Sequence, residues 1–116
     1  MNDAQLNNAL EKFRELLKEQ DERNQRIKAA GAPKDFNSLE KIVIGVCGGD
    51  GIGPIITKQS AEVLKFILKD EVESGRIVFK YIDGLTIENR VAAMKAIPDD
   101  VMEELKSCDV ILKGPT

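Results

Sequence analysis

The sequence predicts an α/β fold with three parallel strands in the order second, first, third, joined by crossover helices and preceded by a long accessory helix. Three short runs rich in β-branched residues, 42–47, 77–82 and 109–113, alternate with helical patterns. The first run leads directly into the glycine segment 48–53, which opens a helix. Right-handed crossovers join parallel neighbours, and apolar runs are buried on both faces only in central strands, so we expect the first strand in the middle.

An accessory helix is expected over residues 3–30. Asn2 is placed to cap it, with Gln5 three residues later, and Gly31 followed by Pro33 supplies the stop. The helix carries a narrow apolar stripe formed by Leu6, Leu10, Phe13 and Leu17, with Ala9 and Leu16 beside it. We expect this stripe to dock the helix on the rest of the protein, and pairing with another subunit is the alternative.

Residues 31–40 contain several turn formers and are predicted to be a linker between the accessory helix and an incomplete α/β domain over 41–116. Within that domain, Gly53 is expected to cap a crossover helix that has Pro54 at its first position and ends at Gly75. Its predicted inner face consists of Ile56, Val63, Leu64, Ile67 and Leu68.

Two shorter helices are expected between the second and third strands. Thr86 is placed to cap the first, which Pro98 ends, and Asp99 or Asp100 is placed to cap the second. The inward residues are predicted to be Ile87, Val91 and Met94 on the first helix, and Val101, Leu105 and Cys108 with the second. Three parallel strands leave apolar surface that further chain or a partner must cover, so the sequence reads as the front of something longer.

The composition disfavours several classes of partner and of catalytic chemistry. The net charge of -3 and the aromatic content of 4% disfavour a nucleic-acid partner. The absence of a long apolar stretch or a secretory signal predicts a cytoplasmic protein without a membrane partner. Histidine is absent, which removes the commonest general base and metal ligand. Cys47 and Cys108 lie in or beside predicted buried strands, where free thiols act as small hydrophobes.

The glycine segment lies where α/β proteins place ligands, at the carboxyl edge of the sheet and the start of a helix. Its spacing, Gly49-x-Gly51-x-Gly53, lacks the Gly-x-Gly-x-x-Gly dinucleotide fingerprint, and Pro54 stands where a phosphate-binding loop needs lysine. An alternative interpretation is therefore a purely structural tight turn, which needs glycine only for its backbone conformation. Asp50 is expected to fix the loop shape through backbone N–H groups.

Two motifs, in this order and spacing, resemble the isocitrate and isopropylmalate dehydrogenases. The segment Gly49-Asp50-Gly51-Ile52-Gly53-Pro54 resembles the N-terminal signature of that family. Ile97-Pro98 and the later run Asp109-Val110-Ile111-Leu112-Lys113-Gly114-Pro115-Thr116 resemble its approach to the cofactor and substrate loop. Lys113–Thr116 favours the isocitrate branch, and residues 84–90 resemble bacterial NAD-linked isocitrate dehydrogenases.

The resemblance implies that residues 41–116 are the N-terminal, cofactor-side part of an isopropylmalate-dehydrogenase-like fold. The implied reaction is oxidation of a small 2-hydroxy acid by hydride transfer to NAD or NADP, followed by decarboxylation assisted by Mg²⁺ or Mn²⁺. By the same resemblance, Ile52 packs against the cofactor, Gly51 and Gly53 allow its approach, Lys113 shapes the following loop, and Thr116 begins that loop.

The resemblance also places the catalytic residues and metal ligands outside this chain, so the 116 residues alone are expected to be inactive. The implied partners are the small-molecule substrate, the remainder of the polypeptide and a second subunit in a homodimer or higher homo-oligomer. The alternative is a self-standing α/β nucleotide-binding or protein-interaction module without catalysis.

Overall fold

A computed structural model describes all residues, 1–116, as two units, Met1–Asp35 and Phe36–Thr116. The first unit contains helix α1, Asp3–Ala29. The predicted capping box is confirmed: the Asn2 side chain accepts from the Gln5 N–H, and the Gln5 side chain accepts from the Asn2 N–H, both at 2.9 Å. No residue of α1 is buried. The structure shows no helix long and apolar enough to cross a membrane.

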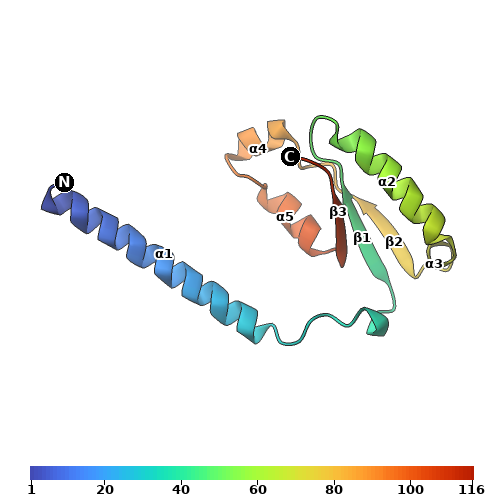
Figure 1. Cartoon of the computed structure of the whole chain (residues 1–116), viewed down its shortest axis with the longest axis horizontal. Helices are drawn as coiled ribbons and strands as arrows, with labels where there is room; N and C mark the ends of the chain where they lie inside the picture. Colours follow the sequence, from blue (N-terminus) through green and yellow to red (C-terminus); the bar gives the residue numbers. More distant parts are fainter. The chain divides into compact units, whose positions relative to one another are not determined.

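The second unit begins with a 3₁₀ turn, η1, and continues as a three-stranded sheet with helices (Figure 1). Its elements are η1 (Phe36–Ser38), β1 (Ile42–Cys47), α2 (Gly53–Ile67), α3 (Lys69–Glu73), β2 (Ile77–Tyr81), α4 (Ile87–Ala93), α5 (Asp99–Lys106) and β3 (Val110–Lys113). The strand order is β2-β1-β3 and both pairings are parallel, so the predicted α/β fold with a central first strand is confirmed.

Alternation along β1 sends successive side chains to opposite faces of the sheet, and each face has its own core. Ile44 and Val46 pack with Ala61 of α2 and Ile77 of β2. On the opposite face, Cys47 belongs to a second cluster. The other buried members of that cluster are Ile82, Leu85, Val101 and Leu105. Figure 1 accordingly shows the sheet between α2 on one side and α5 on the other.

Gly45 sets the distance between β1 and the chain after α5. A Cβ at this position would lie 2.8 Å from the Cys108 Sγ and 3.3 Å from a terminal carbon of Ile82. The predicted inward direction of Val101 and Leu105 is confirmed by their exposure of 2% and 8%, and Cys108 packs beside them.

The predicted inner face of the crossover helix is partly wrong. Thr57 and Ala61 are the side chains that α2 buries, whereas Ile56, Val63 and Ile67 are exposed. Small side chains face the sheet because α2 starts directly beside the glycine segment and lies close to it. Apolar residues cover a broad arc of α2 outside one polar face, so periodicity alone does not identify the buried side.

The expected single crossover helix is also interrupted at Leu68, whose φ of -100° and ψ of 28° separate α2 from α3. Leu68 and Val72 nevertheless pack against the core on the α2 side of the sheet. The predicted stop at Gly75 is confirmed, since Gly75 follows α3 with a φ of +78°.

Helix α4 differs from prediction in its end and in its buried face. Thr86 caps it as predicted, but it ends at Met94 in the left-handed conformation, before Pro98. Ile87, Val91 and Met94 are all exposed, because α4 is held at its ends by polar contacts and covers no core. Helix α5 begins after Pro98 without the predicted aspartate side-chain cap.

Strand β3 lies at an edge of the sheet and is less covered than predicted. Val110 and Ile111 are 43% and 46% exposed, although their apolar run predicts burial on both faces. The central strand has the expected burial, with its last four residues buried.

Candidate functional site

The carboxyl ends of all three strands meet at one edge of the sheet, where three loops come together. These loops are the glycine segment after β1, the connection from β2 to α4, and the residues after β3. Since the crossovers leave β1 toward β2 and reach β3 on the other side, the crevice beside β1 is a topological switch point. In Figure 1 the C-terminus lies near the loop that joins β1 to α2.

The glycine segment is a tight loop with two left-handed residues. Gly49 and Gly51 have φ values of +71° and +57°, and the Gly53 N–H donates to the Asp50 carbonyl at 2.9 Å. Ile52, with helical φ and ψ, is the residue before the first turn of α2. The left-handed backbone conformation is by itself a sufficient reason for glycine at both Gly49 and Gly51.

The segment after β3 packs directly on this loop. The Asp50 N–H donates to the Pro115 carbonyl at 3.0 Å, and the Gly114 N–H donates to the Cys47 carbonyl at 2.8 Å. A Cβ on Gly49 would lie 2.0 Å from the Pro115 oxygen, which real structures do not allow. Position 49 therefore requires glycine for two reasons: the positive φ and the close approach of the Pro115 backbone.

Gly53 and Gly114 are constrained by the same piece of backbone. A Cβ on either would lie about as close to the Gly48 carbonyl oxygen, at 2.0 Å and 2.2 Å respectively. Gly53 is buried, so the demand for glycine there comes from the protein's own packing. Gly51 is different: it is exposed and nothing lies within 4 Å of the point that a Cβ would occupy, so its outer side is open.

Asp50 connects the glycine segment to α4. Its Oδ1 accepts from the Ile87 N–H at 2.9 Å, and its Oδ2 lies 3.9 Å from an Nη of Arg90. The Oδ2 atom is buried and makes no hydrogen bond. Arg90 in turn donates to the Ala96 carbonyl at 2.9 Å. Asp50 therefore fixes loop geometry through a backbone N–H, as its position in the sequence suggests.

The five residues predicted to contact or support the cofactor all lie at this edge. Lys113 donates from Nζ to the Gly114 carbonyl and to the Thr116 Oγ1, both at 2.9 Å, and so ties the chain after β3 into a turn. Ile52 is 62% exposed, and Gly51 is exposed beside it. Gly53 lies beneath them. The structure thus brings Gly114, Pro115 and Thr116 against the glycine segment, and Lys113 holds the turn that they form.

A cavity of about 420 Å³ opens at the same edge, between α2 and the end of β2. Besides the buried Thr57, its polar lining comes from Lys58 and Glu62 on α2, and from Tyr81, Asp83 and Thr86 at and after the end of β2. The sequence motifs point to none of these five side chains as part of the site. Asp83 and Thr86 could have been found because they follow the second strand, but only the folded chain brings them opposite Lys58.

Lys65 extends this polar face along α2. Its Nζ donates to the Tyr81 hydroxyl at 2.9 Å and to Glu62 at 3.2 Å, and lies 5.6 Å from the centre of the Phe79 ring. The hydrogen bond with Tyr81, followed by that with Glu62, raises the pKa of Lys65. The ammonium remains charged throughout the physiological range and cannot serve there as a general base.

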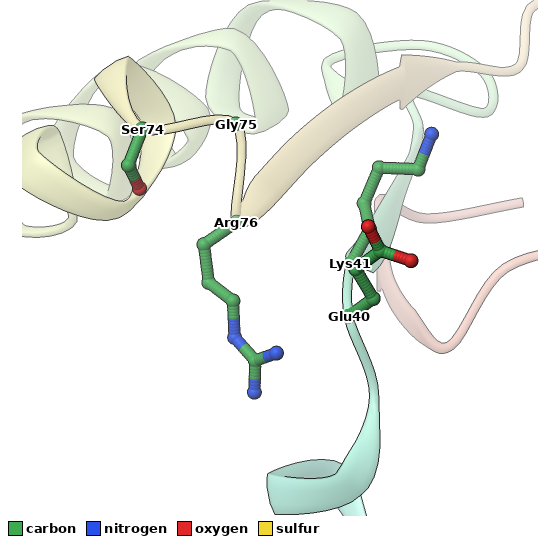
Figure 2. Close-up of a pocket in the computed structure, with 5 residues that line it drawn as sticks. All are labelled: Glu40, Lys41, Ser74, Gly75 and Arg76. Carbon is green, nitrogen blue, oxygen red and sulfur yellow. The ribbon is translucent and has the colours of Figure 1, made fainter.

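A second cavity, of about 500 Å³, lies at the opposite edge, near the amino ends of β1 and β2 (Figure 2). It is lined by Glu40, Lys41, Ser74, Gly75 and Arg76. Figure 2 shows the Arg76 side chain extending away from the start of β2, and its guanidinium donates to the Phe36 carbonyl at 3.0 Å. This edge is not where parallel sheets bind ligands, and we assign Arg76 to anchoring the segment before β1.

Burial controls the chemistry of Cys47, which is 0% exposed. Desolvation raises the pKa of its thiol, although a backbone hydrogen bond near Gly49 acts in the opposite direction. Cys108 is partly buried, and both cysteines are free thiols. Among residues 1–116 no three His, Cys, Asp or Glu side chains are grouped so that they could hold a metal ion.

We therefore predict that Cys47 resists alkylation in the folded chain and that Cys108 is modified first. The raised pKa keeps the Cys47 thiol protonated to higher pH, and burial blocks the reagent. Mass spectrometry after timed iodoacetamide treatment would measure both rates, and urea-unfolded chain provides the control in which both cysteines react. Faster labelling of Cys47 than of Cys108 would show that the edge of the sheet opens.

The chain is similar to two known dehydrogenases. It is 32% identical over 90 residues to "3-isopropylmalate dehydrogenase 1" of Bradyrhizobium diazoefficiens, covering 70% of this chain and 21% of the relative. It is 35% identical over 69 residues to the 3-isopropylmalate dehydrogenase of Carboxydothermus hydrogenoformans, covering 60% and 18% respectively.

The matched region thus spans about a fifth of the length of these relatives. No family model and no solved structure matches the chain. Both relatives belong to the family that the glycine segment and residues Lys113–Thr116 resemble. Together they support the isocitrate/isopropylmalate dehydrogenase family for this chain.

Proposed function

We propose that this chain is the cofactor-side segment of a decarboxylating dehydrogenase that oxidises isocitrate, or a related 2-hydroxy acid such as 3-isopropylmalate. The observation that carries the proposal is the similarity to two 3-isopropylmalate dehydrogenases. The placement of Gly49 against Pro115 at the carboxyl edge supports it, because this packing joins the two segments that resemble the family.

Within the family, we favour a bacterial NAD-dependent isocitrate dehydrogenase. The support is the sequence Lys113-Gly114-Pro115-Thr116 and the segment 84–90, which resemble that group. Both named relatives are 3-isopropylmalate dehydrogenases, so the substrate must be decided by comparing the two acids directly. The proposal includes NADP as the alternative cofactor.

For the nicotinamide cofactor, the residues present fit a contact surface at the start of α2. Gly51 is open on its outer side, and Ile52 presents an exposed apolar side chain beside it. We assign cofactor contact to Ile52, with Gly51 and Gly53 allowing close approach. Lys113 holds the turn from which Thr116 leads toward the cofactor. The cofactor itself supplies the hydride acceptor.

The chain's own residues do not fit a divalent metal site, since they form no group of three metal-ligating side chains. We therefore place the ligands of Mg²⁺ or Mn²⁺, and the acid–base residues, in the remainder of the polypeptide. The arginines are also dispersed over α1, the amino edge of the sheet and α4, so they form no clamp for a di- or tricarboxylate. This segment's role is to position the cofactor.

Uncovered apolar surface supports completion of this unit by further protein. Val110 and Ile111 are half exposed on the edge strand, and Phe66 and Ile67 on α2 are 82% and 67% exposed. Burial of such residues is favourable by about 1.5 to 3 kcal/mol each. We propose that the remainder of the polypeptide covers them, and that the complete enzyme is a cytoplasmic homodimer or higher homo-oligomer.

We expect the purified 116-residue chain to show no reduction of NAD or NADP with isocitrate or 3-isopropylmalate in the presence of Mg²⁺. The reason is that it holds neither a metal-ligand group nor a convergent anion clamp. Absorbance of the reduced cofactor measures the outcome. Activity that follows the chain through every purification step would contradict the prediction.

The matching positive experiment uses the complete polypeptide that carries this segment. We expect turnover with isocitrate to exceed turnover with 3-isopropylmalate, and to require the divalent metal. Preference for 3-isopropylmalate would move the protein to the other branch of the family. No turnover with either acid, together with a folded and monomeric 116-residue chain, would favour the self-standing binding module.

A further inference from the structure

Helix α1 carries a regular sequence repeat along its whole length. Leu6, Leu10, Phe13 and Leu17 follow one another at intervals of four, three and four residues. The same alternation continues through three more positions, occupied by Gln20, Asn24 and Ile27. Seven positions at a mean spacing of 3.5 residues define a heptad seam, the pattern of helices that pair along their length.

All apolar residues of this seam are exposed within their own unit. Leu6, Leu10, Phe13, Leu17 and Ile27 are between 48% and 60% exposed. Ala9 and Leu16, which is 50% exposed, flank the seam on one side only, whereas a helix docked on a sheet needs a broader apolar stripe with a period of 3.6 residues. A second helix of the same kind is the surface that fits it.

The polar contacts of α1 lie beside the seam and leave it free. Lys12 pairs with Glu15 at 3.0 Å, Arg14 pairs with Glu11, and the Gln25 amide donates to Asp21 at 2.7 Å. None of these side chains occupies a seam position. The helix is therefore solvated along its flanks and presents an uninterrupted line of seam residues.

The two amides in the seam indicate which partner it takes. In a parallel, in-register pair, Gln20 meets Gln20 of the partner subunit and Asn24 meets Asn24 of the partner subunit. Each amide is both donor and acceptor, so identical amides can satisfy one another. The steps of four and three residues along the seam place Asn24 at an a position of the heptad. Asparagine at an a position favours a two-stranded parallel arrangement in one register.

Antiparallel pairing is less compatible with the same residues. It can match Leu6 with Leu17, and Leu10 with Phe13, only if residues 20–29 extend beyond the interface. Registers that overlap the whole helix place an amide against an apolar side chain, which leaves its hydrogen bonds unmade.

We propose that α1 pairs with α1 of a second copy of this chain as a parallel two-stranded coiled coil. The proposal does not depend on the dehydrogenase assignment. One contact would oppose this pairing, because it would bring Arg23 near Lys28 of the partner subunit, close to the end of the helix. Because these are like charges, added salt should tighten the association slightly instead of weakening it.

Disulfide trapping tests the orientation. Gln20→Cys places a thiol in the seam, and Glu22→Cys places one on the outer side of the same turn. Under mild oxidation we expect Gln20→Cys to form a covalent dimer at least about tenfold faster than Glu22→Cys, because paired seam positions hold the two thiols together. The native chain, with Cys47 and Cys108, gives the baseline. Equal rates for the two variants would overturn the parallel register.

Sedimentation equilibrium tests the pairing itself. We expect the native chain to be a dimer, and the seam variant Leu10→Glu/Leu17→Glu to dissociate with a dissociation constant raised by about a hundredfold or more. The matched control is Asn8→Glu, which adds charge to the outer face of α1 and should leave the dissociation constant within about twofold. Circular dichroism of the second unit confirms that it remains folded. A monomeric native chain, or a seam variant that dimerises like the native chain, would overturn the proposal.

Discussion

Replacing Gly49 with alanine is expected to lower the free energy of unfolding of the second unit by about 3 kcal/mol or more. Part of the cost is the left-handed conformation, with φ at +71°, which disfavours a Cβ by about 1 to 2 kcal/mol. The rest arises because the new Cβ would lie 2.0 Å from the Pro115 oxygen, so the turn after β3 must move. Urea unfolding followed by circular dichroism measures the change.

Gly51 provides the matched control. It has nearly the same conformation, with φ at +57°, but nothing lies within 4 Å of a Cβ placed there. Gly51→Ala should therefore cost only about 1 to 2 kcal/mol, the conformational part alone. The difference between the two variants measures the contact between the glycine segment and Pro115. Equal losses for both would show that this contact contributes nothing to stability.

The strand order could be predicted because local signals and topology agree. Gly75 and the glycine segment after Cys47 mark the ends of the crossover, and β-branched runs mark the strands. Given these elements, the handedness of parallel crossovers leaves few arrangements. Asn2 and Thr86 were also predictable as caps, since a cap depends on only a few neighbouring residues.

The buried faces of α2 and α4 could not be predicted, for a different reason. Apart from the polar face of Lys58, Glu62 and Lys65, α2 carries apolar residues over a broad arc, so several of its sides could face the sheet. Thr57 and Ala61 face it because they are small. Helix α4 has an apolar periodicity but is held by Asp50 and by its capping Thr86 at the surface. Periodicity reports which residues could be buried, and the rest of the fold decides which are.

The candidate site was only partly accessible from the sequence. The glycine segment and Lys113–Thr116 each have recognisable order, and the fold brings them together through the Pro115 carbonyl. The cavity beside them is lined in part by Gly48 and Gly49 of the glycine segment, but its charged side chains belong to no motif, because they come from α2 and from the residues after β2. Side chains that only tertiary structure brings together leave no fixed spacing in a sequence.

Ile52→Asp in the complete enzyme is expected to raise the dissociation constant for the cofactor by about tenfold or more, equivalent to about 1.4 kcal/mol. Ile52 is 62% exposed within this unit and occupies the carboxyl edge of the sheet, beside the open side of Gly51. An added carboxylate there would repel the phosphates of NAD or NADP and remove an apolar contact. Fluorescence titration with the reduced cofactor measures the affinity.

The conservative variant Ile52→Val distinguishes the loss of a cofactor contact from a loss of folding. Valine keeps the apolar surface, so cofactor affinity should stay within about threefold of the native value. Thermal unfolding of both variants should resemble that of the native enzyme, because an exposed side chain at the start of α2 supports no core. Native affinity in a folded Ile52→Asp enzyme would remove Ile52 from the cofactor site, and the glycine segment would then be a structural turn whose conformation serves only the packing of Gly49 against Pro115.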